Sequence, residues 1–94
     1  MSLDKIREDI EKVDFEILRL IARRMELAEA IIEEKKKLGL PINNDRQNAL
    51  VLKRAMERAT ELNVDTASVR EIFSMLIQMS IDRQHEMAGE GNLP

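Results

Sequence analysis

The sequence predicts an all-α fold of three helices, long, short and medium, that assemble as an intertwined homodimeric helical bundle. Apolar residues recur at a helical period over most of the chain, and no segment shows the alternation typical of a strand. Glycine and proline, which interrupt helices, are confined to residues 39–41 and 89–94. The first uninterrupted segment is too long for a chain of 94 residues to cover by itself.

The first helix is expected over residues 3–38, which contain neither glycine nor proline. Gly39 supplies a C-terminal stop, and Pro41 follows two residues later. A helix of this length extends about 50 Å, beyond the diameter of a small domain. The long helix therefore predicts a second copy of the chain, most simply in an intertwined homodimer.

Two shorter helices are expected after the break, over residues 45–62 and 66–87. The candidate N-caps are Asn43 or Asn44 for the second helix and Asp65 or Thr66 for the third. We assign residues 1–88 to one helical domain and residues 89–94 to a frayed C-terminal tail. A chain of this length leaves no room for a regulatory domain.

Composition argues against several classes of function. The chain is 44% hydrophobic and 35% charged with a net charge of −3, which describes one soluble domain. Mild acidity and only two aromatic residues disfavour nucleic-acid binding. No apolar run approaches the roughly 20 residues that span a membrane, and no basic-then-apolar leader is present. A single histidine and no cysteine disfavour a metal site. The absence of cysteine fits a reducing compartment, so we expect a cytoplasmic location.

Two cations interrupt the apolar stripe of the first helix. Arg24 and Lys35 are 11 residues apart, so they share one face of the helix with Cα atoms about 16 Å apart. Burying an unpaired charge is costly, and no acidic residue occupies the apolar stripes to neutralise them. Each also has a purely structural explanation, because Arg24 can extend its head to solvent and Lys35 lies near a helix C-terminus.

Polar residues also fall on or beside the other apolar stripes. Ser80 and Gln84 interrupt the third helix, Asn48 lies on the apolar side of the second, and Arg7 flanks the stripe of the first. A hydroxyl can bond to its own helix, the amides can lie at an interface and Arg7 can be a surface residue. Taken together, however, these residues and the two cations predict a cationic cavity that requires an anionic ligand.

The segments "IREDIEKVDFEILRLIARRMELAEAIIEEKKKLGLPI" and "IFSMLIQMSIDRQ" resemble the opening and closing helices of the small all-helical class of chorismate mutase. The resemblance covers residues 3–87. The residues that keep the family's spacing are Arg7, Asp14, Arg24, Lys35, Ser80 and Gln84. The resemblance implies an intertwined dimer with two active sites, each containing an arginine from the partner's first helix.

This resemblance implies the rearrangement of chorismate to prephenate, a step of the shikimate pathway towards phenylalanine and tyrosine, without cofactor or metal. Fixed donors hold the dicarboxylate in a reactive shape and stabilise negative charge that grows on its ether oxygen. The implied catalytic residues are Arg24, Lys35 and Gln84. The implied substrate-binding residues are Arg7, Arg24, Lys35, Asn44, Gln47, Asn48, Ser80 and Gln84.

Each implied residue has an expected role. Arg24, and Arg7 of the other chain, hold substrate carboxylates, and Ser80 assists a carboxylate. Lys35 and Gln84 donate to the ether oxygen. Because a glutamine donates without titrating, activity is expected to persist at neutral pH.

The start of the second helix departs from the family pattern, which has an arginine followed by a glutamate. Counted without gaps from Pro41, these positions are Gln47 and Asn48, whereas a shift of one residue makes them Arg46 and Gln47. Helical phase favours the ungapped count because it puts Asn48 on the apolar side. Asn44 corresponds to the loop residue that binds the ring hydroxyl through its backbone.

Two other functions remain open at this stage. An isochorismate–pyruvate lyase shares the scaffold and acts on a dicarboxylate of nearly the same shape. A non-catalytic helical dimerisation module would tolerate apolar residues in place of Arg24, Lys35 and Gln84.

Overall fold

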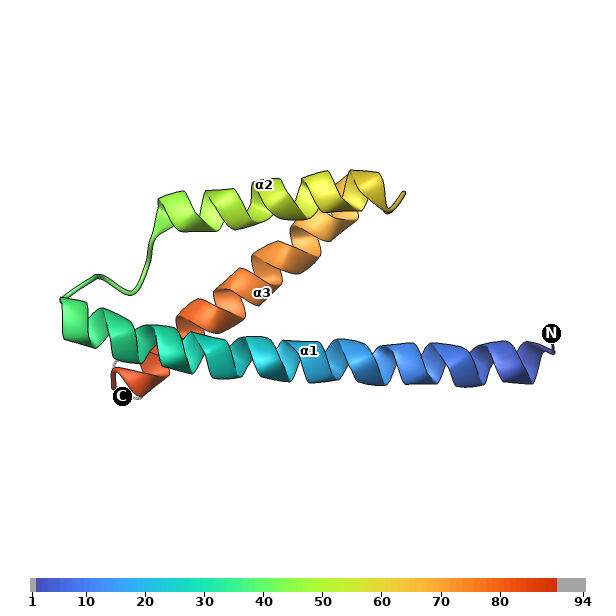
Figure 1. The fold of residues 1–94 in the computed structure, drawn as a ribbon, viewed down its shortest axis with the longest axis horizontal. Helices are drawn as coiled ribbons and strands as arrows, with labels where there is room; N and C mark the ends of the chain where they lie inside the picture. The colour runs from blue at the N-terminus through green and yellow to red at the C-terminus, as the bar shows by residue number, and fades with distance from the viewer. Residues whose placement is uncertain (1, 90–94) are drawn as a thin grey trace.

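The computed structural model describes residues 2–89, which form three α-helices and no strand (Figure 1). Helix α1 spans Leu3–Leu38, α2 spans Asp45–Glu61 and α3 spans Thr66–Met87. The all-α prediction is confirmed, with Leu62 acting as the C-cap of α2 rather than as its last residue. Most of the tail expected to fray, residues 90–94, lies outside the described residues.

Side-chain caps explain where the three helices begin. Ser2, Asn44 and Asp65 precede α1, α2 and α3, and each accepts a hydrogen bond from the backbone N–H three residues on, at 2.9–3.1 Å. Such a bond satisfies one of the donors that the first turn of a helix leaves unpaired. The structure therefore selects Asn44 and Asp65 from the alternative caps that the sequence left open.

Gly39 ends α1 in a left-handed conformation, with φ at 68°. The N–H groups of Gly39 and Leu40 donate to the carbonyls of Lys36 and Lys35, at 3.4 and 2.9 Å. This conformation costs an L-residue free energy because its Cβ approaches the following carbonyl. The turn sends the chain towards α2, whose start lies on the same side of the molecule as the end of α1 (Figure 1).

Helix α3 packs against both α1 and α2. Within residues 2–89, α1 and α2 do not pack against each other. Figure 1 shows α3 crossing from the end of α2 to the C-terminal half of α1, while the N-terminal half of α1 extends beyond both. The radius of gyration is 16.5 Å, against about 12 Å for a compact chain of this length. No helix among the described residues is both long and apolar enough to cross a membrane.

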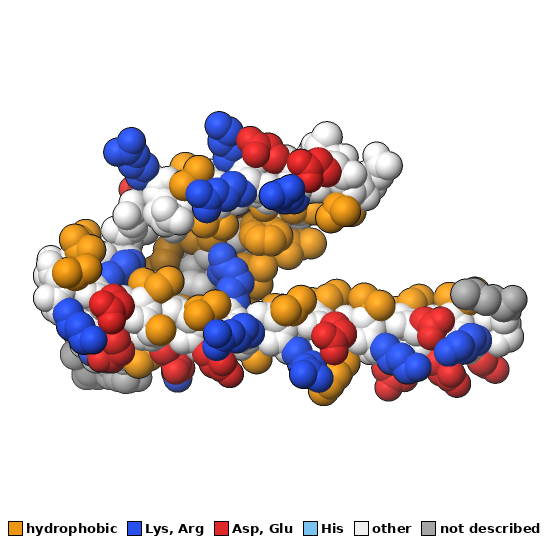
Figure 2. Space-filling view, in the orientation of Figure 1, with side chains coloured by type: hydrophobic (Ala, Val, Ile, Leu, Met, Phe, Trp, Pro, Cys, Tyr) orange, Lys and Arg blue, Asp and Glu red, His pale blue; other side chains and the backbone are white. Residues whose placement is uncertain are grey.

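The single chain has a small core. The buried hydrophobic residues among those described are Ala28, Ile32, Ala55 and Ala59. Much of the apolar stripe of α1 is instead exposed, including Leu20 at 67%, because no helix of the same chain packs against that half of α1. Figure 2 shows hydrophobic side chains along this half. So little apolar burial falls short of what a domain of this size needs.

We expect Gly39→Ala to lower the free energy of unfolding by about 1 kcal/mol through backbone strain alone. An added Cβ would meet no atom within 4 Å, so steric overlap adds nothing. Urea unfolding at a fixed protein concentration measures the loss. Gly39→Asn is the matched control, because asparagine visits the left-handed region more readily and should lose less; equal losses in the two variants would contradict this explanation.

Candidate active site

A cavity of about 350 Å³ lies between the C-terminal halves of α1 and α3 and the start of α2. Its volume is within the range of small-molecule sites, which combine apolar walls with a few polar groups. The apolar part of the wall includes Leu27, Ile31 and Val51. Seven of the eight predicted site residues line it: Arg24, Lys35, Asn44, Gln47, Asn48, Ser80 and Gln84.

Arg7 is exposed and does not line this cavity. It precedes Arg24 by 17 residues on one continuous helix, a distance of about 25 Å along the axis. No side chain spans that distance, so Arg7 cannot reach the cavity of its own chain. Arg46 is also outside the lining, whereas Gln47 and Asn48 are inside it, as the helical phase of the ungapped count requires.

Arg24 is half-buried and held by neutral oxygens of α3. Its Nη1 donates to the Leu76 carbonyl at 3.2 Å and to Ser80 Oγ at 3.1 Å. The Ser80 hydroxyl in turn donates to the Leu76 carbonyl at 3.2 Å. A guanidinium carries five N–H donors, so these two bonds occupy Nη1 and leave the Nε–Nη2 edge. That edge has the geometry for two parallel hydrogen bonds to one carboxylate.

Lys35 is held in a similar way, between the loop before α2 and α3. Its Nζ donates to the Ile42 carbonyl and, at 3.0 Å, to Gln84 Oε1. An ammonium has three donors and no acceptor, so one N–H remains and Gln84 must turn its oxygen towards Lys35. The Gln84 Nε2 group then points elsewhere. This Nε2 group makes no hydrogen bond to the described residues. Because no buried side-chain nitrogen among them lacks a partner, Nε2 must be accessible, and the cavity is the space that Gln84 lines.

The cavity is cationic because no acidic side chain among the described residues lines it or forms an ion pair with Arg24 or Lys35. Burial lowers the pKa of the Lys35 ammonium, since desolvation disfavours the charged form. The opposite effect is seen outside the cavity, where hydrogen bonds to Glu29 raise the pKa of Arg83. The uncompensated charge favours an anionic ligand.

A charged pair, Glu29 and Arg83, also joins α1 to α3. Arg83 Nε and Nη2 both donate to Glu29 Oε1, at 2.8 and 2.5 Å. Both side chains are more than a third exposed, so solvent screens their attraction. The pair therefore contributes little to the free energy of unfolding.

Polar side chains at the start of α2 form the remaining wall. Asn44 Oδ1 caps the helix through Gln47 N, at 3.1 Å. Asn48 Nδ2 donates to Asn43 Oδ1 at 3.0 Å, and Asn43 Nδ2 donates to Asp45 Oδ1 at 3.1 Å. This wall therefore presents carboxamides, where the family pattern expected an arginine and a glutamate.

Two partners of the site residues were not predicted from the sequence. The Ile42 carbonyl that holds Lys35 is a backbone atom, for which the residue type gives no signal. The sequence marks Asn43 only as a candidate helix cap, and it contacts Asn48 because it lies in the loop just before α2. The sequence signal for Asn43 is a second carboxamide directly before the cap, Asn44.

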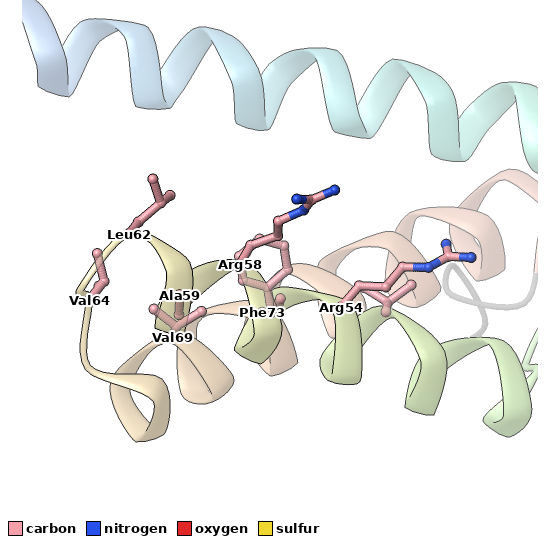
Figure 3. A pocket seen from close by; sticks show the side chains of 9 residues that line it. Arg54, Arg58, Ala59, Leu62, Val64, Val69 and Phe73 are labelled. Atoms are coloured by element: carbon pink, nitrogen blue, oxygen red, sulfur yellow. The ribbon is translucent and has the colours of Figure 1, made fainter.

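A second cavity, of about 450 Å³, lies between α2 and α3 (Figure 3). Most of its lining is apolar, including Ala59, Val69 and Phe73, and Arg54 and Arg58 of α2 also line it. Figure 3 shows Arg58 and Leu62 projecting towards the side where the N-terminal half of α1 lies. We refer to this second cavity as the α2–α3 groove.

Comparison with known proteins places the chain in a defined group. A family described as "Chorismate mutase type II" matches residues 6–85. The chorismate mutase of Methanocaldococcus jannaschii is 38% identical over 77 residues, which cover 82% of this chain and 78% of that protein. The T-protein of Enterobacter agglomerans is 27% identical over 85 residues, or 90% of this chain and 23% of that protein.

A bifunctional chorismate mutase/prephenate dehydratase of Buchnera aphidicola subsp. Schizaphis graminum is 26% identical over 86 residues. The match covers 92% of this chain and 22% of that protein. The chain thus spans less than a quarter of these two longer relatives but most of the archaeal mutase.

The lowered pKa of Lys35 predicts a particular dependence of stability on pH. Between the folded pKa and the ordinary value of 10.5, the unfolded chain binds more protons than the folded chain, so the free energy of unfolding rises with pH across that window. Lys35→Met removes this rise, and at neutral pH it also removes the cost of desolvating the ammonium. We expect the variant to be at least as stable as wild type at neutral pH, with the difference moving in favour of wild type as pH approaches 10.5.

Urea unfolding of both proteins at about pH 7 and about pH 10 measures this change. Lys37→Met is the control, because Lys37 lies two residues on, on the other side of α1, and its side chain is 69% exposed. A difference between Lys35→Met and wild type that is the same at both pH values would contradict a lowered pKa.

Proposed function

The chain belongs to the chorismate mutase type II family, and on that premise we propose that the cavity between α1, α2 and α3 is where it rearranges chorismate to prephenate. The reaction serves aromatic amino-acid biosynthesis. The observation that carries the proposal is the pair of cations, Arg24 and Lys35, held by neutral partners with donors left over in one cavity. A dicarboxylate is the ligand that such a site favours.

The rearrangement breaks a C–O bond and forms a C–C bond within one molecule, so no proton or electron leaves the substrate. The protein needs only to hold a compact conformation and to stabilise charge on the ether oxygen. In our proposal the Nε–Nη2 edge of Arg24 binds a carboxylate, and Ser80 orients the guanidinium. The remaining Lys35 N–H and the Gln84 amide nitrogen donate to the ether oxygen.

The start of α2 would bind the rest of the substrate. Gln47 and Asn48 replace the charged pair of the family pattern with neutral donors and acceptors, and Asn44 offers its backbone to the ring hydroxyl. Arg24 would then balance the charge of one substrate carboxylate, and an arginine of another chain would balance the charge of the other. Arg7 of a second copy would supply that arginine.

The homodimer is part of the same proposal and is supported by two complementary apolar surfaces. One is the N-terminal half of α1, where Ile10, Val13 and Ile17 are each at least 50% exposed. The other is the α2–α3 groove, lined by Phe73 and other apolar residues (Figure 3). A second copy of α1 laid across the groove would bury both surfaces and would bring its Arg7 towards the cavity. The proposed location of the dimer is the cytoplasm, for which the support is a chain without cysteine.

Purified protein is expected to convert chorismate to prephenate, and Lys35→Ala is expected to lower kcat/KM by about 10²- to 10³-fold, since removing one donor to a developing oxyanion has this effect. Chorismate consumption and prephenate formation are followed together. Lys37→Ala is the control that should retain wild-type turnover, because Lys37 is exposed on the other side of α1.

Near wild-type turnover of Lys35→Ala would contradict the assignment of the cavity. Isochorismate is tested beside chorismate, because salicylate and pyruvate would reveal the lyase that shares this scaffold. A protein that acts on neither substrate would instead be the non-catalytic module.

Arg7→Ala and Arg24→Ala are each expected to abolish most turnover, and a refolded equal mixture of the two is expected to regain activity. If Arg7 acts in the partner's site, each mixed dimer has one intact site, so random mixing restores about a quarter of wild-type turnover. The measurement is turnover of the mixture before and after joint unfolding and refolding. No regain of activity in mixed dimers, confirmed by native mass spectrometry, would show that both arginines act on the same site of one chain.

A further inference from the structure

We propose that Asp45 and Asn43 form a hydrogen-bond relay that fixes the Asn48 carboxamide with its oxygen directed to the cavity, so that both are positioning residues for substrate binding. The inference deepens the proposed function and rests on it, because Asn48 lines the cavity assigned to chorismate. Neither Asp45 nor Asn43 lines that cavity, so both act through Asn48.

The direction of the relay follows from the chemistry of its first member. A carboxylate at neutral pH only accepts hydrogen bonds, so Asn43 must turn its Nδ2 towards Asp45, at 3.1 Å. The Asn43 oxygen is then on the opposite side of the amide and can only accept. Asn48 meets this oxygen at 3.0 Å and must therefore present its own Nδ2. One carboxylate thus sets the orientation of two amides in succession.

In this relay the Asn48 oxygen is the atom left without a hydrogen bond to the described residues. Asn48 is half-buried, its Oδ1 makes no hydrogen bond to the described residues, and no buried side-chain oxygen among them is unpaired, so this oxygen is accessible on a residue that lines the cavity. A free amide could turn and present its NH₂ group instead. Held by the relay, Asn48 offers an acceptor to a substrate hydroxyl, which is the task that a carboxylate would otherwise perform. The relay therefore preserves an acceptor at this wall without adding a negative charge.

A simple charge effect predicts the opposite result of the same substitution. Asp45→Asn removes a negative charge near a site for a dianion, so electrostatics alone should lower KM. The relay predicts a higher KM, because the introduced carboxamide could donate to Asn43 and reverse both amides. A ground-state contact that persists in the transition state affects KM and leaves kcat unchanged. The sign of the change in KM therefore separates the two explanations.

The experiment compares the steady-state kinetics of wild type, Asp45→Asn, Asn43→Leu and a double variant that combines Asn43→Asp with Asp45→Asn, all with chorismate. The two single variants are expected to raise KM about three- to tenfold, the value of one hydrogen bond, with little change in kcat. The double variant keeps the net charge and returns an acceptor to position 43, so its KM is expected to return to within about twofold of wild type. Asp82→Asn is the control, because Asp82 is exposed on α3 and accepts only from Gln78 among the described residues.

A second readout needs no substrate. The side-chain amide resonance of Asn48 in ¹⁵N–¹H spectra is expected to shift in Asp45→Asn and to return in the double variant. An unchanged or lower KM in the single variants, or a double variant that does not recover, overturns the relay while leaving the mutase assignment intact. If wild type forms no prephenate, the proposed function fails, and the amide resonance then confirms or overturns the relay by itself.

Discussion

Two cations held only by neutral atoms are the feature on which the cavity depends. Arg24 and Lys35 are drawn against α3 by the Leu76 carbonyl, Ser80 and Gln84, without an acidic partner among the described residues. An aspartate or glutamate in place of these neutral partners would neutralise the charge and remove the affinity for an anion. Neutral acceptors instead fix the geometry and leave the charge available, at the cost of a desolvated ammonium.

The length of α1 sets the second constraint. Helix α1 has 36 residues, and only α3, with 22 residues, packs against one half of it, because α2 packs on α3 instead. The exposed apolar half of α1 and the apolar α2–α3 groove are consequences of the same mismatch. In the dimer that we propose, a single contact would both complete the hydrophobic core and bring Arg7 to the other chain's cavity. Stability and catalysis would then share one interface.

The start of α2 is where the proposed site differs most from the family pattern. In the ungapped count Gln47 and Asn48 take the positions where the family pattern has charged residues, and the α2 side chains that line this wall are uncharged. A carboxamide can serve as donor or acceptor, and its orientation must be imposed by its neighbours. The proposed relay through Asn43 and Asp45 would impose that orientation at Asn48. A single carboxylate could accept the substrate hydroxyl by itself, whereas the proposed site would need three side chains: Asn48, Asn43 and Asp45.

The sequence by itself determined the three helices and the shared face of Arg24 and Lys35, and it narrowed the caps of the second and third helices to two residues each, because helical period and capping are local properties of the chain. It also predicted which polar residues would meet, through their position in apolar stripes and the family resemblance. Only the tertiary structure decided which donors stay available, since Arg24 and Lys35 meet the Leu76 carbonyl, Ser80 and Gln84 through contacts between α1 and α3. It also decided which apolar residues remain exposed: Leu20 has the pattern of a core residue, but within one chain no helix lies against it.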